Sequence, residues 1–369
     1  MEALYGIGFV AALILALVLT PVVKRFAILV GAVDAPNHRK VHTRIMPRLG
    51  GLAIFLSFAA AFFIILPVLE QYNAKVAWGL LLGGAVVVLV GALDDKMDLS
   101  PKVKLLGQLI AAVIVVSFGV KIELVNLPFG DYIPVGWLSI PLTIFWIVGV
   151  TNAINLIDGL DGLAAGVSAI ATGTTLVLAL MMGNFTVVLL CAVLLGSILG
   201  FLFFNFHPAK IFMGDSGALF LGFSLATLSV LGFKQATLFS FVVPLLILGV
   251  PLSDTFFAIV RRKVNKLPIS VADKNHLHHC LLQLGLSHRN TVLVIYGIAL
   301  FFGAMAVLLS NIPGDATWIA LVFMAAIIVV LQLGAEAIGI VSKQQKPIIH
   351  LVQKLRMKTT RPAARSRMK

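Results

Sequence analysis

Charge is the scarcest property of this sequence. Only 12% of its 369 residues are Asp, Glu, Lys or Arg, whereas 60% are hydrophobic. Soluble globular domains carry about a quarter charged residues. The shortage of charge therefore argues against a soluble protein and predicts an integral membrane protein.

Cysteine is also rare, with Cys191 in an apolar run and Cys280 in a basic segment. Two such distant residues indicate neither a disulfide framework nor a zinc site. The first apolar stretch, from Leu4 to Val23, lacks a preceding basic segment and a small-residue cleavage site. Because it is also longer than the apolar part of a signal peptide, we expect a membrane span that stays in place.

Long apolar runs dominate the rest of the chain. Taking about 20 residues for each span, the sequence predicts an all-α, polytopic membrane protein with about eleven transmembrane helices. Pro134, Gly136 and Pro141 interrupt the start of the fifth. The predicted helices centre near Leu15, Ala60, Val87, Val113, Trp146, Thr172, Leu194, Leu225, Leu246, Phe301 and Ala326.

Acidic residues number 15 against 28 basic ones, which gives a net charge of +13. With the amino terminus outside, 25 of the 28 basic residues fall in inner loops, and only Lys75, Lys121 and Lys234 remain outside. Cytoplasmic loops of membrane proteins are enriched in Lys and Arg. This asymmetry predicts an outer amino terminus and a cytoplasmic carboxyl terminus, and it accounts for the basic charge without a nucleic-acid partner.

Two domains are expected, a transmembrane domain over residues 1–342 and a basic cytoplasmic tail over residues 343–369. The tail either lies on anionic lipid or is solvated. Nine aspartates fall on the same inner side as the basic loops: Asp34, Asp94, Asp95, Asp98, Asp158, Asp161, Asp215, Asp254 and Asp273. Because charge at the ends of membrane helices is costly and usually functional, we expect the chemistry on this surface.

The run Gly91–Asp98 closes the third predicted span. Asp94 and Asp98 are four residues apart and are expected to share one helix face. Carboxylates at a membrane boundary bind Mg²⁺, directly or through substrate phosphates. An acidic helix end exposed to solvent is the alternative interpretation.

The segment NAINLIDGLDGL at residues 152–163 is more specific. Asn152, Asn155 and Asp158 fall on one face of a helix, whereas Asp161 would lie opposite if the helix continued. Gly159 and Gly162 therefore predict a turn that returns Asp161 to the same pocket. Helix capping alone is a poor explanation for four polar residues in so apolar a chain.

The segment MGDSG at residues 213–217 begins another span. Its two glycines let backbone amides approach a phosphate, and a helix amino terminus is itself an anion site. Asp215 is expected to hold Mg²⁺ beside that phosphate, and Asp215 or Ser216 to cap the helix. A simple helix start is the alternative.

The loop after the ninth span combines acidic, basic and imidazole groups. His276 and His279 are three residues apart and can share a helix face. A zinc site is one interpretation, but the basic neighbours favour phosphate or sugar contacts. Arg261 and Arg262 also suit simple anchors of the positive inner side. The first inner loop, which includes Lys40, is similarly basic, and the pair Gly50–Gly51 after it opens the second span.

Together these features suit phosphoryl transfer, which needs charge neutralisation and in-line positioning more than a strong nucleophile. The oxygen ligands favour Mg²⁺ as cofactor, with Mn²⁺ as an alternative. A transporter would place its acids at the membrane midplane on repeated, broken helices. A membrane prenyltransferase would share the DDxxD motif but usually carries a second Asp-rich repeat. The chain shows neither pattern, and the transporter and the prenyltransferase stay open as alternatives to a phosphotransferase.

The motifs resemble those of the polyprenyl-phosphate N-acetylhexosamine-1-phosphate transferases (the MraY/WecA/TagO group). The resemblance rests on DDKMD at 94–98, NAINLIDGLDGL at 152–163, MGDSG at 213–217 and HLHH at 276–279, in the family's order. It implies transfer of a sugar phosphate from a UDP-sugar to undecaprenyl phosphate, with release of UMP. It also implies a bacterial cell (inner) membrane location, an active site facing the cytoplasm and contact with membrane lipid, and it admits a homodimer.

The resemblance also implies roles for individual residues. Asp215 and Asn155 would be Mg²⁺ ligands, and Asp94 and Asp95 would position or deprotonate the lipid phosphate. The nucleotide pocket would contain Asn152, Asp158 and Asp161. The sugar and its phosphates would contact His276, His278, His279, Arg262, Lys104 and Lys40, with Lys104 also serving as counter-charge to the lipid phosphate.

The histidine loop points to one branch of the family. The branch that uses UDP-MurNAc-pentapeptide typically shows three consecutive histidines, whereas this chain reads His-Leu-His-His. That pattern is similar to the UDP-N-acetylglucosamine branch, whose lipid product begins teichoic acid or related polymers. Direct attack by the lipid phosphate is favoured over a covalent Asp intermediate, because the phosphate is already anionic.

Overall fold

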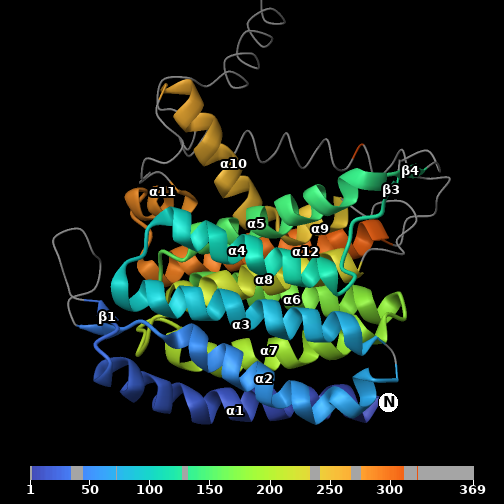
Figure 1. Ribbon diagram of the computed structural model, residues 1–369. Helices are drawn as coiled ribbons and strands as arrows, with labels where there is room; N and C mark the ends of the chain where they lie inside the picture. The colour runs from blue at the N-terminus through green and yellow to red at the C-terminus, as the bar shows by residue number, and fades with distance from the viewer. Residues whose placement is uncertain are drawn as a thin grey trace, which may run out of the picture.

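The computed structural model describes residues 2–34, 45–71, 73–126, 132–232, 242–266, 276–310 and 322. Helices make up most of these ranges (Figure 1). They are α1 (Glu2–Leu29), α2 (Gly50–Leu69), α3 (Ala74–Met97), α4 (Pro101–Ser117), α5 (Ser139–Ile157), α6 (Leu163–Met181), α7 (Phe185–Asn205), α8 (Gly214–Gly232), α9 (Val242–Ile247), α10 (Gly249–Val264), α11 (Leu277–Gln283) and α12 (His288–Ser310).

Two short antiparallel hairpins, which the sequence did not predict, join some of these helices. The first pairs β1 (Val33–Asp34) with β2 (Met46–Pro47), and the second pairs β3 (Leu124–Asn126) with β4 (Tyr132–Pro134). A 3-10 turn, η1 (Gly136–Leu138), leads into α5. Each hairpin lies at an end of the bundle, so the all-α core that the sequence predicts is confirmed.

Eight helices in the described part of the chain are long and apolar enough to cross a membrane. They match predicted spans one to three, five to eight and ten. The fourth, α4, is 17 residues long, and the ninth is divided at Leu248 into the shorter α9 and α10. The predicted span near Ala326 lies outside the described residues, so the number eleven stays a prediction.

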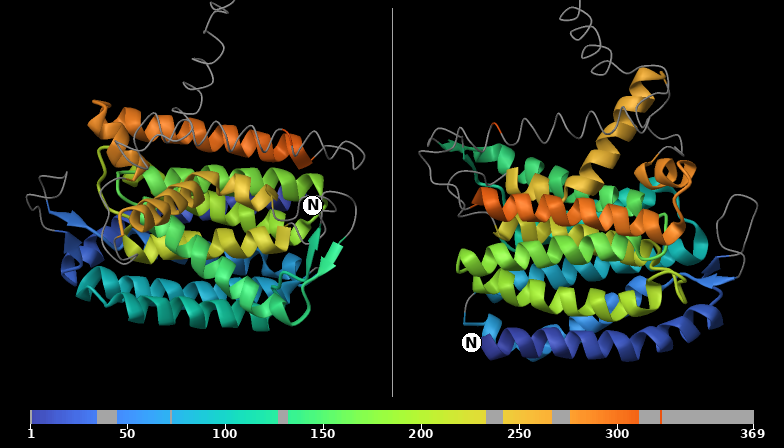
Figure 2. Two further views of the ribbon diagram at one scale, coloured as in Figure 1. Left: turned by 90° about the horizontal axis from the view of Figure 1, so that it is seen from above. Right: turned by 180° about the vertical axis from the view of Figure 1, so that it is seen from behind.

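The helices lie side by side along a common direction, apart from α10, which leans away from the bundle (Figure 1). Seen from behind, α12, α6, α7 and α1 follow one another across the molecule (Figure 2). Helix α8 is at the centre, where it packs against α2, α3, α5 and α6. In the most apolar 18-residue stretch of α8, 89% of the residues are buried, compared with 28% in that of α1.

Several buried hydroxyl groups of the central helices are satisfied within their own helix. Ser57, Thr172 and Thr227 each donate to the carbonyl four residues earlier in their own helix, at 2.8, 2.7 and 2.8 Å. In hydrocarbon such local bonds satisfy a hydroxyl that has no access to water. Between helices, the Trp146 indole N–H donates to Ser229 Oγ at 3.0 Å and joins α5 to α8.

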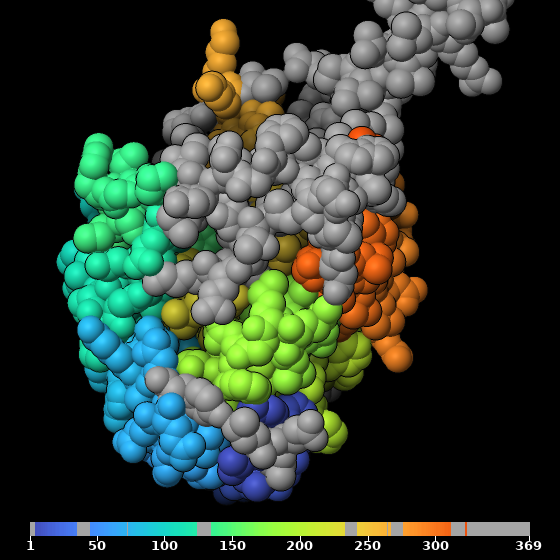
Figure 3. All heavy atoms as spheres, turned by 90° about the vertical axis from the view of Figure 1, so that its right-hand side faces the viewer, coloured from blue at the N-terminus to red at the C-terminus, as the bar shows by residue number. Residues whose placement is uncertain are grey.

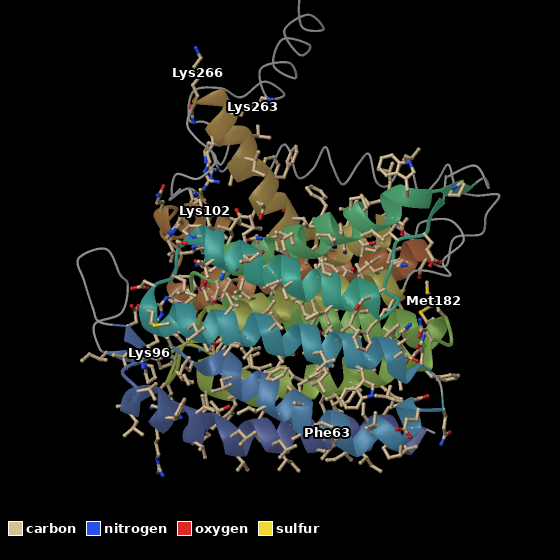
Figure 4. The ribbon with its side chains drawn as sticks, in the orientation of Figure 1. Phe63, Lys96, Lys102, Met182, Lys263 and Lys266 are labelled. Carbon is tan, nitrogen blue, oxygen red and sulfur yellow. The ribbon has the colours of Figure 1, made fainter. Side chains whose placement is uncertain are left out.

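The polar motifs gather at one end of this bundle. Lys96 and Lys102 lie at that end and Met182 at the other (Figure 4). The opposite end, which carries the amino terminus, shows α2, the α6–α7 connection and α12 beside one another (Figure 3). The carboxyl ends of α3 and α5 and the amino end of α8 therefore meet on a single polar surface.

Candidate active site

Four polar residues from four helices form the centre of this surface. Lys104 Nζ lies 3.2 Å from Asp94 Oδ2 and 2.9 Å from Asp215 Oδ2. The Asn155 amide donates to Asp215 Oδ1 at 3.1 Å. The structure thus brings together residues that the sequence assigned to the lipid phosphate and to the metal.

Asp94 is buried in the last turn of α3. Its Oδ1 accepts the backbone N–H of Leu99 at 2.8 Å, and its Oδ2 faces Lys104. Helix α3 ends at Met97, and Asp98 follows in the left-handed conformation with a φ of 49° and a 94% exposed side chain. The prediction that Asp94 and Asp98 share a helix face is therefore wrong, because the helix ends between them.

Asp95 is buried and caps α8 from the neighbouring helix α3. Its Oδ1 accepts the backbone N–H of Asp215 at 2.8 Å, while its Oδ2 accepts the backbone N–H and the hydroxyl of Ser216 at 3.1 and 2.8 Å. Gly214 leaves room for this carboxylate, since a Cβ there would lie 2.4 Å from Oδ2. The expected cap from Asp215 or Ser216 is wrong, because an acid from α3 occupies that position.

The Gly50–Gly51 pair brings the start of α2 against the start of α8. The backbone N–H of Gly51 donates to the carbonyl of Met213 at 2.8 Å. A Cβ on Gly51 would lie 1.9 Å from the backbone nitrogen of Gly217, and one on Gly91 would lie 2.5 Å from that of Ser216. These glycines therefore permit close helix packing, and this packing fixes the position of Asp215.

Asp158 follows the end of α5, where the predicted turn is confirmed: Gly162 has a φ of +75° and α6 begins after it. In the described part of the chain, the Asp158 carboxylate has no hydrogen bond or ion pair. Burial, and then the negative charges of Asp215 and Asp95, raise the pKa of Asp158 to about 8. This part of the site therefore has more negative charge than its described neighbours neutralise.

Asn152 lies one helical turn before Asn155 and is paired with a residue that the sequence did not single out. Its amide donates to Gln108 Oε1 at 2.6 Å and to the carbonyl of Val148 at 2.8 Å. Gln108 is buried and lies one turn beyond Lys104 on α4. The pair joins α4 to α5 beside the centre, and the nucleotide role of Asn152 stays a prediction.

Asp161 lies apart from Asp94 and Asp215, the lysine-bridged pair that Lys104 joins. It contacts two histidines that the sequence did not assign to the site. His207 Nδ1 is 2.9 Å from Asp161 Oδ2, and the Asp161 backbone N–H donates to His288 Nε2 at 3.0 Å. The backbone N–H of Ala209 also donates to Oδ2, at 3.1 Å. These contacts join distant segments, and no pattern in the sequence signals them.

The histidine loop is held by Asp254 of α10. Asp254 Oδ1 accepts the backbone N–H of Leu277 at 2.8 Å, and its Oδ2 lies 2.8 Å from His276 Nδ1. Asp254 and His276 are both buried. Because His276 precedes α11, the prediction that it shares a helix face with His279 is wrong, and Asp254 is a positioning group that the assigned site omitted.

His278 connects this loop to the acidic centre. Its ring packs on Gly159, where a Cβ would lie 2.4 Å from His278 Nε2. Burial, and then the charge of neighbouring His279, lower the pKa of His278 to about 4. The side chain that packs on Gly159 is therefore a neutral imidazole at cellular pH.

Arg262 belongs to the last turn of α10 and is 9% exposed. Within the residues that the structure describes, its Nε has no hydrogen-bond acceptor. By contrast, Lys263 and Lys266 point away from the bundle (Figure 4). A buried guanidinium with an unfilled donor suits an anionic ligand. Lys40, the remaining predicted phosphate contact, lies outside the described residues.

Comparison with known proteins gives consistent results. The sequence pattern of glycosyl transferase family 4 matches residues 77–233. The chain is 48% identical to the probable undecaprenyl-phosphate N-acetylglucosaminyl 1-phosphate transferase of Bacillus subtilis, over 95% of this chain and 96% of that protein. It is 37% identical to the decaprenyl-phosphate N-acetylglucosaminephosphotransferase of Mycobacterium tuberculosis, over 88% and 86%. It is 32% identical to the phospho-N-acetylmuramoyl-pentapeptide-transferase of Halalkalibacterium halodurans, over 71% and 83%.

Proposed function

This chain belongs to the polyprenyl-phosphate sugar-1-phosphate transferases of glycosyl transferase family 4, and on that basis we propose that it transfers N-acetylglucosamine 1-phosphate from UDP-GlcNAc to undecaprenyl phosphate. UMP is the second product. The observation that carries the proposal is the meeting of Asp94, Lys104 and Asp215 at the polar end of a membrane bundle. Near them lies the carboxylate of Asp158, which has no partner among the described residues.

In the proposed reaction, a phosphate oxygen of the lipid attacks the β-phosphorus of UDP-GlcNAc. The bond from that phosphorus to the oxygen bridging to the α-phosphate breaks, and UMP leaves with the bonding electron pair. The lipid phosphate is already an anion and needs little activation. Lys104, which bridges Asp94 and Asp215, is the cation placed to attract it and to offset charge in the transition state.

A covalent aspartyl intermediate is the less favoured route. Such a nucleophile needs a carboxylate oxygen free to attack phosphorus. Both oxygens of Asp95 accept hydrogen bonds from the start of α8, and Asp94 and Asp215 each have an oxygen 3.2 Å or less from Lys104. These contacts support Asp95 as the acid that holds α8, and Asp94 and Asp215 as the acids that face the reactants.

The residues fit the Mg²⁺ that the family resemblance implies. Oxygen donors of Asp215, Asp158 and Asn155 converge here, and the side-chain oxygen of Asn155, Oδ1, has no hydrogen bond in the described part of the chain. The raised pKa of Asp158 is the sign of crowded carboxylates that a cation would relieve. When bound, Mg²⁺ supplies charge neutralisation for the leaving phosphate.

The sugar nucleotide is proposed to lie between the acidic centre and the histidine loop. Arg262 offers its phosphates a buried Nε donor that has no acceptor among the described residues. His278 packs on Gly159, in the loop that follows Asp158, and its ring is neutral at cellular pH. The loop Asp158–Gly162 would then line the nucleotide, and His276 would stay fixed by Asp254.

The donor sugar and the membrane side also belong to this proposal. The His-Leu-His-His loop and the 48% and 37% identical relatives named for N-acetylglucosamine favour UDP-GlcNAc over UDP-MurNAc-pentapeptide. The basic inner loops favour a cytoplasmic active site in the bacterial cell membrane. A lipid that carries one sugar diphosphate is the starting point for a cell-envelope polysaccharide such as teichoic acid.

A UMP-release assay tests this function. Protein purified in detergent receives Mg²⁺, undecaprenyl phosphate and one of three donors: UDP-GlcNAc, UDP-GalNAc or UDP-MurNAc-pentapeptide. We expect release with UDP-GlcNAc alone. Release only with the pentapeptide donor would retain the chemistry and contradict the proposed sugar. No release with any donor, from folded protein, would contradict the function.

A further inference from the structure

A cluster of two histidines and an acid lies beside the nucleotide loop, outside the lysine-bridged pair. Asp161 comes from the α5–α6 loop, His207 from the α7–α8 loop, and His288 is the first residue of α12. Ligand atoms of the three all lie within 4.8 Å of one another. The two imidazole rings stack with centroids 4.3 Å apart and planes 20° apart.

The hydrogen bonds show which ring nitrogen of each histidine donates and which accepts. His207 Nδ1 faces a carboxylate oxygen, so it must carry the proton and donate to Asp161. His288 Nε2 receives the Asp161 backbone N–H, so this nitrogen must be unprotonated. One histidine therefore holds the Asp161 side chain, and the other holds its backbone.

Two further hydrogen bonds hold the α5–α6 loop at Gly162. The backbone N–H of Gly162 donates to Asn205 Oδ1 at 3.1 Å, and the Tyr296 hydroxyl donates to the carbonyl of Gly162. With His207 and Ala209 both on Oδ2, the remaining oxygen of Asp161, Oδ1, has no hydrogen bond in the part of the chain that the structure describes. Asp161 thus presents one free acceptor in a fixed position.

We propose that His207 and His288 are positioning residues that fix Asp161 as a single-oxygen acceptor for an N–H group of the nucleobase. The inference rests on the proposed function, because it requires a nucleotide donor. It assigns a task to two side chains outside the four motifs. The histidines act through Asp161, so their effect should fall on nucleotide binding and leave the lipid site unchanged.

A metal site is the competing interpretation of the same three residues. His and carboxylate ligands at this spacing suit zinc. However, His207 Nδ1 and His288 Nε2 are both used in hydrogen bonds to Asp161. A metal on these atoms would take away the only acceptor that the Asp161 N–H has in the described structure. The hydrogen bonds between the two histidines and Asp161 therefore explain the geometry better than a metal does.

Paired variants separate a positioning role from a packing role. His288→Gln keeps an acceptor near the Nε2 position but loses the ring, whereas His288→Phe keeps a stacking ring and loses the acceptor. His207→Asn and His207→Phe form the same pair for a donor at Nδ1. Arg289→Gln changes an exposed neighbour and serves as control.

We expect each Phe variant to raise the KM for UDP-GlcNAc by about tenfold, the effect of one lost hydrogen bond to a positioned group. In the Phe variants, the KM for undecaprenyl phosphate should stay within about twofold of wild type. In His288→Gln, His207→Asn and the Arg289→Gln control, the KM values for both substrates should stay within about threefold of wild type. Competitive inhibition by UMP should weaken in parallel. If a Phe variant does not fold, His288→Asn, whose shorter amide falls short of the Asp161 N–H, takes its place.

Equal KM values for wild-type and Phe variants would overturn the inference, as would an equal loss in the Gln and Phe variants of His288. Stoichiometric zinc in the purified wild-type protein, measured by elemental mass spectrometry, would overturn it in favour of the metal site. Failure of the wild-type protein to release UMP is a different result: it contradicts the proposed function itself and with it this inference.

Discussion

Lys104 Nζ lies between two carboxylates, 2.9 Å from Asp215 and 3.2 Å from Asp94. The first acid lies in the first turn of α8 and the second in the last turn of α3, so one lysine from α4 joins three helices at the proposed reaction centre. Its charge offsets theirs while no substrate is bound, and it faces the place where the lipid phosphate is proposed to arrive.

Replacing Lys104 by Met should therefore reduce kcat by about 100-fold or more, as expected when a preorganised charge is removed from a transition state. UMP release under saturating substrates measures this. Lys102→Met is the matched control, because Lys102 is exposed two residues earlier on the same helix and should remain near wild type. A Lys104→Met protein with more than half of wild-type kcat would contradict the role.

Replacing Asp95 by Asn should destabilise the protein by about 1–3 kcal/mol, because one acceptor oxygen becomes an amide facing buried N–H donors. Thermal unfolding in detergent measures the loss. Asp98→Asn serves as control, since this exposed residue has a left-handed backbone that Asn tolerates well. Unchanged stability of the Asp95 variant with lost activity would instead favour a direct catalytic role for this acid.

The Mg²⁺ requirement should depend on pH through Asp158. Its pKa, raised to about 8 by burial and by the charges of Asp215 and Asp95, leaves the carboxyl largely protonated at neutral pH. A divalent cation must displace that proton, so the Mg²⁺ concentration for half-maximal activity should fall as pH rises from 6 toward 8, by up to about tenfold per unit. Asp158→Asn should weaken Mg²⁺ dependence and flatten the profile; a flat wild-type profile would count against the assignment.

Stability should also depend on pH through His278. Burial and the charge of His279 lower the pKa of His278 to about 4, against 6.5 for an unperturbed histidine. The unfolded chain then binds more protons in this window, so the folded state loses stability as pH falls from 6.5 to 4. The loss attributable to this group reaches about 3 kcal/mol at most. Thermal unfolding of His278→Gln should show a smaller slope than wild type, and equal slopes would contradict the lowered pKa.

The sequence predicts the membrane helices well because their signal is composition, which depends on no tertiary contact. The apolar runs place α1, α2, α3 and α5–α8 correctly. The sequence does not predict the β1–β2 and β3–β4 hairpins or the division of the ninth span at Leu248. Both depend on tertiary contacts with neighbouring helices and not on local composition. The sidedness of the membrane, the tail beyond residue 342 and the homodimer stay predictions.

The candidate site is predicted in its residue types and less well in its partnerships. The family resemblance implies that Asp94, Asn155 and Asp215 act at one site. The structure places Asp94 and Asn155 on either side of Asp215, through Lys104 and a direct hydrogen bond. Spacing cannot reveal that Asp95 caps a helix 120 positions further along the chain. The contacts of Asp254, His207 and His288 are equally long-range, and single side chains carry them without any local pattern.

The central claim is that the β-phosphate moves with the sugar onto the lipid. UDP-GlcNAc labelled with ³²P at the β-phosphate, incubated with purified protein, Mg²⁺ and undecaprenyl phosphate, tests it directly when lipid and nucleotide fractions are separated. We predict label in the lipid fraction together with unlabelled UMP, and no transfer by an Asp215→Asn protein that folds normally. Label that remains in the nucleotide fraction as UDP while sugar reaches the lipid would show ordinary glycosyl transfer and contradict the account.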